Sequence, residues 1–518
     1  MTRVFPMLMP AAATDARPNR CLARLLSRSV RVFRWNEPAA LAQCHLLCPR
    51  SGHHHDGNPT RQRGKCSVLR GEQVILADAS GYQDRFAVES RWHWALAAGS
   101  RFHSRRAPSA HKSYAESFLS MCLAVIAILL FIGPVWGEQF EKATVFQNGE
   151  EGYKVFRIPA IVTAANGDLL AFCEARMGGD QSEIDLVSKR SIDGGRTWQG
   201  IQVVQESDEL REEFDQENTQ VSVGNPAPVV DRLDPEHPGR IWLPFTLEND
   251  RVFVTFSDDH GKTWGQRREI TRDVKKDDWG WYATGPVHSI QLQRGEHQGR
   301  LVVPCDHRIG KGGDDRGANG AHAIVSDDHG QTWRLGAIDT TYTDDLNANE
   351  TAVVELNDGR LYFNTRDQGG KAKGTRGDAY SSVGGDSFDR FGGPYRCFKP
   401  SPPQLDPPVV QCALLRAAST VAGDDRNVIL FSGPDESGPS GKGRSDLRIR
   451  YSTDETQTWQ DGPLIHVGRA AYSDMVRLPN DELGILFEAG EGEQQYARII
   501  FTRVSLDEIT GDPFGANR

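Results

Sequence analysis

An arginine stands in the middle of the apolar stretch VFRIPAIV, residues 155–162. The neighbours of Arg157 are aliphatic or aromatic side chains and a proline, as in a strand that enters a protein core. A buried guanidinium costs several kcal/mol unless an anion pairs with it. Two interpretations are therefore open. Either Arg157 is a strand-edge charge that points at water, or it binds an anion that belongs to a ligand.

A repeated pattern predicts the elements that position such a residue. Ser-x-Asp-x-Gly-x-Thr-Trp occurs as SIDGGRTW (191–198), SDDHGKTW (257–264) and SDDHGQTW (326–333). STDETQTW (452–459) has Thr456 at the glycine position. SSVGGDSF (381–388) is a degenerate copy, with Val383 at the Asp position and Phe388 at the Trp position. The copies start 66, 69, 55 and 71 residues apart. A unit that recurs at this scale indicates a repeat architecture.

Each copy has the chemistry of a tight turn. The Ser and Asp side chains can cap backbone N–H groups, and the glycine supplies a positive φ. The segments before the copies (IDLVSKR, DRVFVTF, AHAIV and LRIRY) alternate as strands do. Each copy is thus interpreted as a hairpin turn in a four-stranded sheet. About 360 residues at roughly 60 per sheet predict an all-β fold, a six-bladed β-propeller.

Composition and charge divide the chain. The 52 Gly and 27 Pro favour an all-β protein rich in turns. Residues 1–116 hold 18 Lys and Arg against 8 Asp and Glu, whereas residues 117–518 hold 42 against 62. We predict a basic, poorly ordered extension over 1–116, a signal peptide or membrane anchor over 117–137, and the propeller over 138–518.

The first two segments carry no predicted catalytic function. The basic runs of 1–116 lack any nucleic-acid-binding motif, and this part could also come from a start codon placed too far upstream. The histidine run 53–55 could be a metal tract but is more often an unstructured loop. The apolar run 118–135 is typical of a signal-peptide core, with a membrane anchor as the alternative. We therefore expect an exported protein, periplasmic, secreted or at the cell surface.

The cysteines of the main domain are Cys173, Cys305, Cys397 and Cys412. Their spacing is neither a disulfide framework nor a zinc pattern. Cys397 and Cys412 could pair in an exported protein, and buried free thiols are the alternative.

FRIP followed by several of these turns, known as Asp boxes, resembles the exo-α-sialidase (neuraminidase) family over Ala143 to Val504. The resemblance implies a six-bladed propeller that acts on a terminal sialic acid without a metal or other cofactor. Sialic acid carries a carboxylate on its anomeric carbon, which would be the anion that Arg157 binds.

The resemblance assigns three arginines to this carboxylate. Arg157 is similar to the first, Arg366 in LYFNTRDQ to the second and Arg444 in GRSDLRIRYS to the third. Arg448 and Arg450 are alternatives for the third. Three converging guanidiniums would orient the sugar through charge-assisted, bidentate hydrogen bonds.

The resemblance also implies the catalytic groups. A carboxylate nucleophile would be repelled by the sugar's own carboxylate, so the nucleophile is a neutral tyrosine, matched by Tyr472 in AAYSDMV. A phenol needs a base to activate it, and Glu350 in NANETAVVEL matches, with Glu355 as the alternative. Asp180 in EARMGGDQSE matches the general acid, with Asp185 as second choice.

Further residues are expected around the sugar. Glu174 and Arg176 match a Glu-x-Arg pair, in which Glu174 would orient Arg157 and Arg176 would face the carboxylate side or O4 of the sugar. Glu488 in LFEAGE resembles an acid that supports the arginine cluster.

Substrate contacts are also predicted at Asn225 in GNPAPVV, at Asp306 and His307 in VVPCDHR, and at Glu248 in TLENDRV. For each of these residues a surface-loop role is the alternative.

The sequence therefore predicts a glycoside hydrolase that releases terminal α-linked sialic acid with retention of configuration. Its partners would be a sialylated glycoprotein, glycolipid or oligosaccharide, and no nucleic acid. A catalytically silent sialic-acid-binding propeller and a trans-sialidase are alternatives. A propeller with Asp boxes and another substrate is the third.

Overall fold

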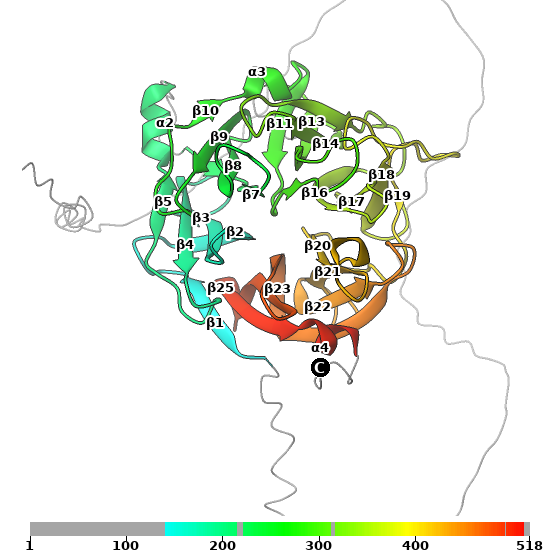
Figure 1. Cartoon of the computed structure of the whole chain (residues 1–518). Coiled ribbons are helices and arrows are strands. Elements are labelled where there is room, and N and C mark those ends of the chain that lie inside the picture. Colours follow the sequence, from blue (N-terminus) through cyan, green and yellow to red (C-terminus); the bar gives the residue numbers. More distant parts are fainter. Residues whose placement is uncertain (1–139, 215–220, 312–315, 493, 512–518) are drawn as a thin grey trace, which may run out of the picture. The chain divides into compact units, whose positions relative to one another are not determined.

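The computed structural model describes residues 140–214, 221–311, 316–492 and 494–511, which form antiparallel sheets arranged around a common centre (Figure 1). The all-β, propeller-like arrangement that we predicted is confirmed. The predicted extension 1–116 and the apolar segment 117–137 lie outside the described residues. No helix within the described ranges combines the length and the apolar character that a membrane crossing requires.

Four of the sheets contain four or five strands each. The first holds β2 (Val155–Thr163), β3 (Leu169–Arg176), β4 (Ile184–Ser191) and β5 (Gln202–Gln205). The second holds β6 (Val223–Gly224), β7 (Val229–Asp231), β8 (Arg240–Leu247), β9 (Arg251–Ser257) and β10 (Arg268–Glu269). The third holds β11 (Trp279–Thr284), β12 (Ile290–Gln291), β13 (Leu301–Ile309), β14 (Asn319–Ser326) and β15 (Arg334–Ile338). The fourth holds β16 (Ala348–Glu355), β17 (Leu361–Asp367), β18 (Arg376–Ser381) and β19 (Lys399–Pro400).

The remaining sheet has seven strands, which follow one another in the order β1-β25-β24-β23-β22-β21-β20. Its members are β1 (Lys142–Gln147), β20 (Ala413–Ala418), β21 (Val428–Pro434), β22 (Ser445–Ser452), β23 (Gln460–Arg477), β24 (Glu482–Glu491) and β25 (Gln494–Ser505). Strand β23 is 18 residues long, pairing with β22 through residues 460–469 and with β24 through residues 470–477. The described residues thus form five hydrogen-bonded sheets where we predicted six separate ones, because β23 continues from one pairing into the next.

The first and last strands of the fold pair with each other. Strand β1 lies antiparallel to β25, with Lys142 opposite Thr502 and Gln147 opposite Arg498. The side chains of Val145 and Phe146 are buried there. This pairing closes the ring of sheets.

The repeated turns have the chemistry expected from their sequence. In the copy at 326–333, Ser326 Oγ accepts the Gly330 N–H at 2.8 Å, and Asp328 accepts the N–H of Thr332 at 2.8 Å and its hydroxyl at 2.6 Å. Gly330 has φ +81°. The copies at 191–198, 257–264 and 452–459 make the same three kinds of bond, and Thr456 adopts φ +70° in the glycine place.

The core lies between adjacent sheets. Leu170 and Phe172 of β3 pack with Leu243 and Phe245 of β8 in one such cluster. The main-domain cysteines that we considered for pairing are all buried and free. Of the two alternatives, the structure therefore has the free thiols.

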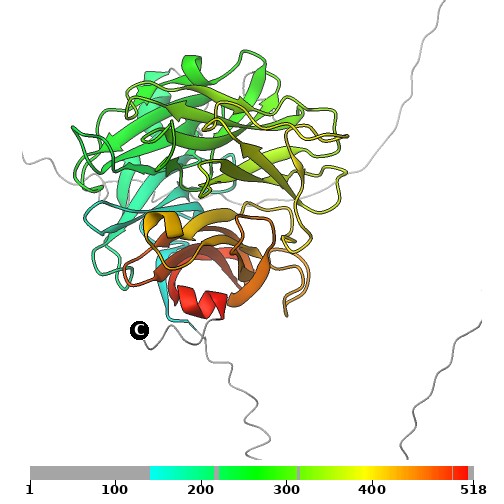
Figure 2. The same cartoon turned by 45° about the vertical axis from the view of Figure 1, so that its right-hand side comes forward.

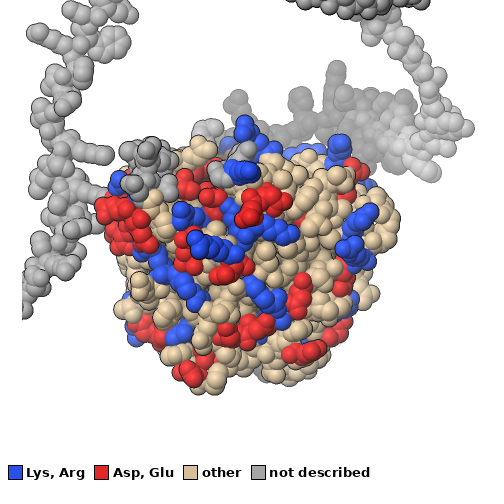
Figure 3. All heavy atoms as spheres, turned by 90° about the horizontal axis from the view of Figure 1, so that it is seen from above, with Lys and Arg blue, Asp and Glu red and all other residues tan. Residues whose placement is uncertain are grey.

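Short helices complete the fold: α2 (Ser207–Glu213), α3 (Thr271–Val274), α4 (Leu506–Thr510) and the 3₁₀ turn η2 (Thr420–Ala422). Figure 2 shows α4, in red, on the outer side of the seven-stranded sheet. Figure 3 shows that acidic and basic side chains are interspersed over one face of the fold.

Candidate active site

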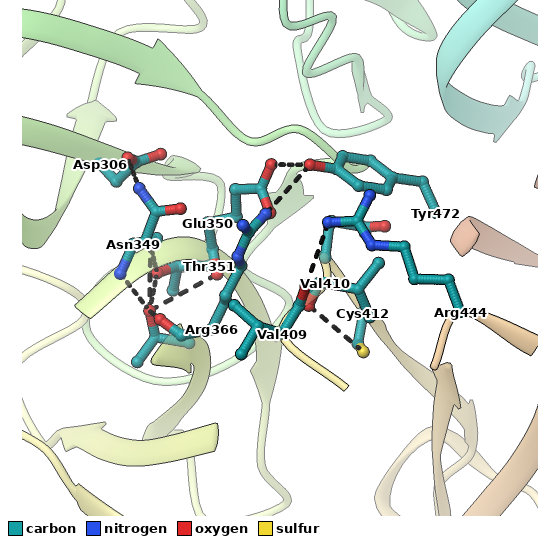
Figure 4. A network of polar contacts seen from close by, with 12 residues as sticks. Asp306, Asn349, Glu350, Thr351, Arg366, Val409, Val410, Cys412, Arg444 and Tyr472 are labelled. Atoms are coloured by element: carbon teal, nitrogen blue, oxygen red, sulfur yellow. Dashed lines mark hydrogen bonds and ion pairs between the residues drawn. The ribbon is translucent and has the colours of Figure 1, made fainter. Parts of the chain in front are cut away.

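The predicted catalytic tyrosine and its base meet across the centre of the fold. Tyr472 lies on β23 and Glu350 on β16, and both strands border the centre in Figure 1. The Tyr472 hydroxyl donates a short hydrogen bond to Glu350 Oε1 (Figure 4). Arg366 Nη1 on β17 donates to Glu350 Oε2 at 2.7 Å and to the Tyr472 oxygen at 3.2 Å.

The phenol is buried and protonated in this arrangement. The residue is 6% exposed. Burial raises the pKa of Tyr472 above its ordinary value, and the Glu350 carboxylate raises it further, while Arg366 and Arg157 oppose the rise. The Glu350 carboxylate is the acidic group in direct contact with the phenol hydroxyl.

A bulge at the start of β16 aims Glu350 at the tyrosine. The register of β16 against β17 shifts between Ala348 and Thr351. The Asn349 N–H donates to Thr365 Oγ1 at 3.0 Å, and Asn349 Nδ2 donates to Asp306 Oδ2 at 2.6 Å. These bonds hold the backbone on one side of Glu350 (Figure 4).

Arg157 does not point at water. It is 8% exposed, and its Nε and Nη2 donate to the two oxygens of Glu488 at 2.9 and 3.0 Å. Glu488 also accepts the N–H of Ile158, which has φ +60°, at 3.0 Å and the N–H of Tyr472 at 3.2 Å. Burial alone would lower the pKa of Arg157, but the paired carboxylate raises it above its ordinary value. One acid thus supports both the first predicted arginine and the backbone of the tyrosine.

Glu174 supports a different arginine from the one we predicted. It accepts the Arg176 Nε at 2.9 Å and the N–H of Asn225, also at 2.9 Å. Although Glu174 lies opposite Arg157 in the β2–β3 register, the carboxylate on Arg157 is that of Glu488. The prediction that Glu174 orients Arg157 is therefore wrong.

Arg444 lies next to the tyrosine and donates to two neutral acceptors. Its Nη1 bonds the hydroxyl of Tyr496 at 2.8 Å and its Nη2 bonds the carbonyl of Val409 at 3.1 Å. Its guanidinium carbon lies 5.7 Å from the centroid of the Tyr472 ring. The alternatives Arg448 and Arg450 form ion pairs with Asp435.

Tyr496 on β25 is a site residue that our sequence analysis missed. Besides its bond with Arg444, its ring lies 3.8 Å from the guanidinium carbon of Arg157. It therefore contacts two of the three predicted carboxylate-binding arginines. No motif in the sequence marks it.

Asp180 projects from the loop after β3 toward the arginines. Its side chain is 81% exposed, it bonds Arg176 Nη1, and its Oδ1 lies 3.9 Å from Arg157 Nη1. Partial loss of hydration would raise the pKa of Asp180, but Arg176 and Arg157 lower it below its ordinary value. The alternative Asp185 instead accepts the Ser207 N–H at 2.7 Å and the Tyr153 hydroxyl at 2.8 Å, which is a structural role.

Two predicted substrate contacts lie beneath the site. Asp306 and His307 are fully buried. Burial raises the pKa of Asp306 well above its usual range and lowers the pKa of His307 to about 3. His307 stacks on Trp279 with ring centroids 3.7 Å apart and lies 2.8 Å from the Tyr342 hydroxyl. The predicted direct contact is therefore corrected: Asp306 supports Asn349, next to Glu350, and His307 packs in the interior of the fold.

The other candidates divide between the site and its surroundings. Asn225, with φ +58°, is tied to the Arg176 cluster through Glu174. Glu248 accepts the N–H of Ser222, and burial raises its pKa. Glu355 bonds the backbone N–H groups of Gln293 and Arg294 and lines a cavity of about 460 Å³ that our site residues do not reach. This position removes Glu355 as the alternative base.

One group of potential metal ligands occurs among the described residues, namely Asp231, Asp234 and His329. Their oxygens already accept hydrogen bonds from backbone groups, from Gln291 and from His329 itself. This group is not part of the site around Tyr472.

Comparison with known proteins agrees with the fold and the repeats. Residues 167–486 match the family described as BNR repeat-like domain, and the chain belongs to this family. The sialidase of Micromonospora viridifaciens is 32% identical over 371 residues, covering 67% of this chain and 51% of that protein. The exo-alpha-sialidase of Aspergillus fumigatus is 28% identical over 405 residues, covering 70% of this chain and 86% of that protein.

Solved structures extend the similarity. The Hadza microbial sialidase Hz136 is 26% identical with a TM-score of 0.57, and the match covers 71% of this chain and 69% of that one. A leech intramolecular trans-sialidase is 17% identical with a TM-score of 0.55, covering 72% and 71%, a likeness that concerns the fold alone. The chain spans about half the length of the Micromonospora relative.

Proposed function

We propose that this chain is an exo-α-sialidase, a glycoside hydrolase that removes terminal α-linked sialic acid from glycoconjugates. The observation that carries the proposal is the buried Tyr472–Glu350 pair with Arg366 on both members. A tyrosine with a carboxylate base suits attack on an anomeric carbon that bears its own carboxylate. The sialidase relatives at 28–32% identity support the substrate class.

The arginines are suited to hold the sugar's carboxylate. Arg157, Arg366 and Arg444 approach the Tyr472 ring or hydroxyl from three strands or strand ends. Arg444 bonds the neutral Tyr496 hydroxyl and the Val409 carbonyl, so its positive charge is suited to an anionic ligand. A carboxylate bound by the arginines would fix the anomeric carbon above the phenol oxygen.

The reaction would proceed in two steps with retention of configuration. Tyr472 passes its proton to Glu350 and attacks C2, while Asp180 protonates the leaving oxygen. In the second step a water molecule gives a proton to Asp180 and attacks C2. The bond between C2 and the Tyr472 oxygen breaks, Glu350 returns its proton to that oxygen, and sialic acid is released. In the free site the neighbouring arginines lower the pKa of Asp180. A substrate carboxylate bound to these arginines would offset their charge and raise that pKa, which suits Asp180 as the acid of the first step.

Two wider features belong to this proposal. If the two pairings of β23 are counted as separate blades, each has four strands and the propeller has six blades. We also propose that the protein is exported, which the apolar run 118–135 supports.

The test is release of a fluorescent aglycone from an aryl α-sialoside by the full chain and by Tyr472→Phe. We expect turnover by the wild type and a loss on the order of 10³-fold or more in kcat for the variant, as when a nucleophile is removed. A dehydrated sialic-acid analogue should bind both proteins within about threefold, because the arginines remain.

Other outcomes would change the proposal. Most of the turnover surviving in Tyr472→Phe would remove the tyrosine from the nucleophile role. A folded wild type that binds the analogue without releasing aglycone would be a silent sialic-acid-binding propeller. NMR of the first sialic-acid anomer formed tests retention, and a sialylated acceptor sugar or an anhydro product would indicate transfer.

A further inference from the structure

Side chains bond the backbone around Tyr472 at an irregularity of the sheet ladder. The register of β23 against β24 shifts between Ala470 and Ser473. At this bulge the Tyr472 N–H goes to Glu488, as described above. The Ser473 N–H donates to Gln411 Oε1 at 3.1 Å, and Gln411 Nε2 donates to the Ser473 carbonyl at 3.0 Å. One carboxamide thus bonds both backbone polar groups of Ser473, the residue that follows the tyrosine and lies opposite Phe487 in the β23–β24 register.

Gln411 is itself firmly placed. It is 2% exposed and belongs to residues 407–412, the last part of the segment 401–412 that joins β19 to β20. Arg376, also 2% exposed, donates to the Val410 carbonyl at 2.8 Å and to Asn364 Oδ1 at 2.8 Å. This buried arginine ties the segment to β17, the strand that carries Arg366.

The same segment contacts the third predicted arginine. Arg444 donates to the carbonyl of Val409, two residues before Gln411. Figure 4 shows Val409 and Val410 near Arg444, whose guanidinium lies next to the Tyr472 ring. Residues 407–412 therefore contact both the backbone of Ser473, next to the tyrosine, and an arginine of the site.

We propose that Gln411 is a positioning residue for the tyrosine. Its carboxamide clamps the backbone of Ser473 and thereby holds the Tyr472 hydroxyl against Glu350 and Arg366. This inference rests on the proposed function, in which Tyr472 attacks the sugar. Glu488 alone cannot set the tyrosine's place, because it holds one N–H of the bulge and its other bonds go to Arg157 and Ile158. A shift of about 1 Å in a reacting group can cost on the order of 10²-fold in rate.

The test compares Gln411→Met with Ser432→Ala in the full chain. Methionine has nearly the shape of glutamine but makes neither bond to Ser473. Ser432 Oγ lies 2.7 Å from Ser473 Oγ, so its loss perturbs the same residue without touching the backbone clamp. We expect Gln411→Met to lower kcat about 10- to 100-fold, with the affinity for the dehydrated analogue within about twofold of wild type. Ser432→Ala should keep kcat within about threefold.

A second readout is independent of turnover. Hydrogen exchange of the peptide that covers residues 470–476 should become faster in Gln411→Met than in wild type or Ser432→Ala. If Gln411→Met does not fold, Gln411→Leu takes its place. It also removes both bonds to Ser473 without burying a charge, and the same fall in kcat is expected.

Three results would overturn the inference. A folded Gln411→Met with kcat within twofold of wild type would show that the clamp is not needed. Equal losses of kcat and analogue affinity would indicate a general disturbance of the pocket. Unchanged exchange at 470–476 would show that the clamp does not hold this backbone. A wild type that binds the analogue but never turns over would instead defeat the proposed function. In that case only the hydrogen exchange of residues 470–476 would show whether Gln411 holds the Ser473 backbone.

Discussion

Tyr496 illustrates how one side chain can serve two charged neighbours at the residue scale. Its ring lies under the Arg157 guanidinium and its hydroxyl accepts from Arg444. The two interactions differ in chemistry, one being cation–π and the other a hydrogen bond from a charged donor. Substitutions can therefore separate them.

We expect Tyr496→Phe to raise KM for an aryl α-sialoside about tenfold, because Arg444 loses a hydrogen bond while the ring under Arg157 remains. Tyr496→Leu should raise KM a further few-fold through the lost cation–π contact. In both variants kcat should change less than KM, as steady-state kinetics would reveal. Equal rises of KM in the two variants would mean that only the hydroxyl contributes. An unchanged KM in both variants would mean that Tyr496 is not needed to position Arg157 or Arg444.

The burial of the His307 side chain predicts that the stability of the fold depends on pH. Its pKa in the fold, about 3, lies below the ordinary value near 6.5, because burial disfavours the imidazolium. As the pH falls, the unfolded chain therefore takes up this proton first. The stabilisation is fully present above pH 6.5 and is lost toward pH 3, at about 1.4 kcal/mol per pH unit.

Urea unfolding of the wild type and of His307→Gln at pH 7, 6, 5 and 4 tests this. The variant should be less stable at pH 7, and its unfolding free energy should fall less steeply with acid. Parallel curves for the two proteins would show that His307 is not buried as the neutral form.

At the scale of the element, the repeated turns do more than connect strands. A Cβ on Gly330 would lie 2.2 Å from the Trp242 ring in the neighbouring sheet, and a Cβ on Gly261 would lie 1.8 Å from Leu170. The glycine in the pattern thus serves both the positive φ and the close contact between sheets. The sequence pattern predicted only the first of these roles.

A pair of substitutions separates the two roles. Gly330 and Gly359 have almost the same φ, +81° and +84°, but nothing lies within 4 Å of a Cβ on Gly359. Gly359→Ala should cost about 1 kcal/mol of unfolding free energy for the left-handed backbone alone. Gly330→Ala should cost about 3 kcal/mol, because overpacking is added. Equal losses in urea unfolding would mean that the Trp242 ring moves aside freely.

At the scale of the whole molecule, ring closure depends on the pairing of β1 with β25. Phe146 packs against Phe156 with ring centroids 5.4 Å apart, and Val145 is buried beside it. A chain of residues 138–518 should therefore unfold at the temperature of the full chain. A chain of residues 148–518 should lose roughly 3–6 kcal/mol, the value of burying Val145 and Phe146.

Thermal unfolding of these two shortened chains measures the difference. A melting temperature that is the same for both would show that the ring holds without β1. A much lower melting temperature for residues 138–518 than for the full chain would assign a stabilising role to residues 1–137.

The sequence alone determined the features that local chemistry specifies. Turn bonds such as those of Ser326 and Asp328 span four residues, so they appear as a pattern, and a resemblance over most of the domain pointed to Tyr472, Glu350 and Arg157. Tertiary structure alone decided which groups pair with them. The carboxylate on Arg157 comes from Glu488, 331 positions away, and the clamp on Ser473 comes from Gln411, 62 positions away. Such contacts depend on bulges and on sheets that meet at the centre, and a side chain's neighbours there leave no periodic trace in the chain.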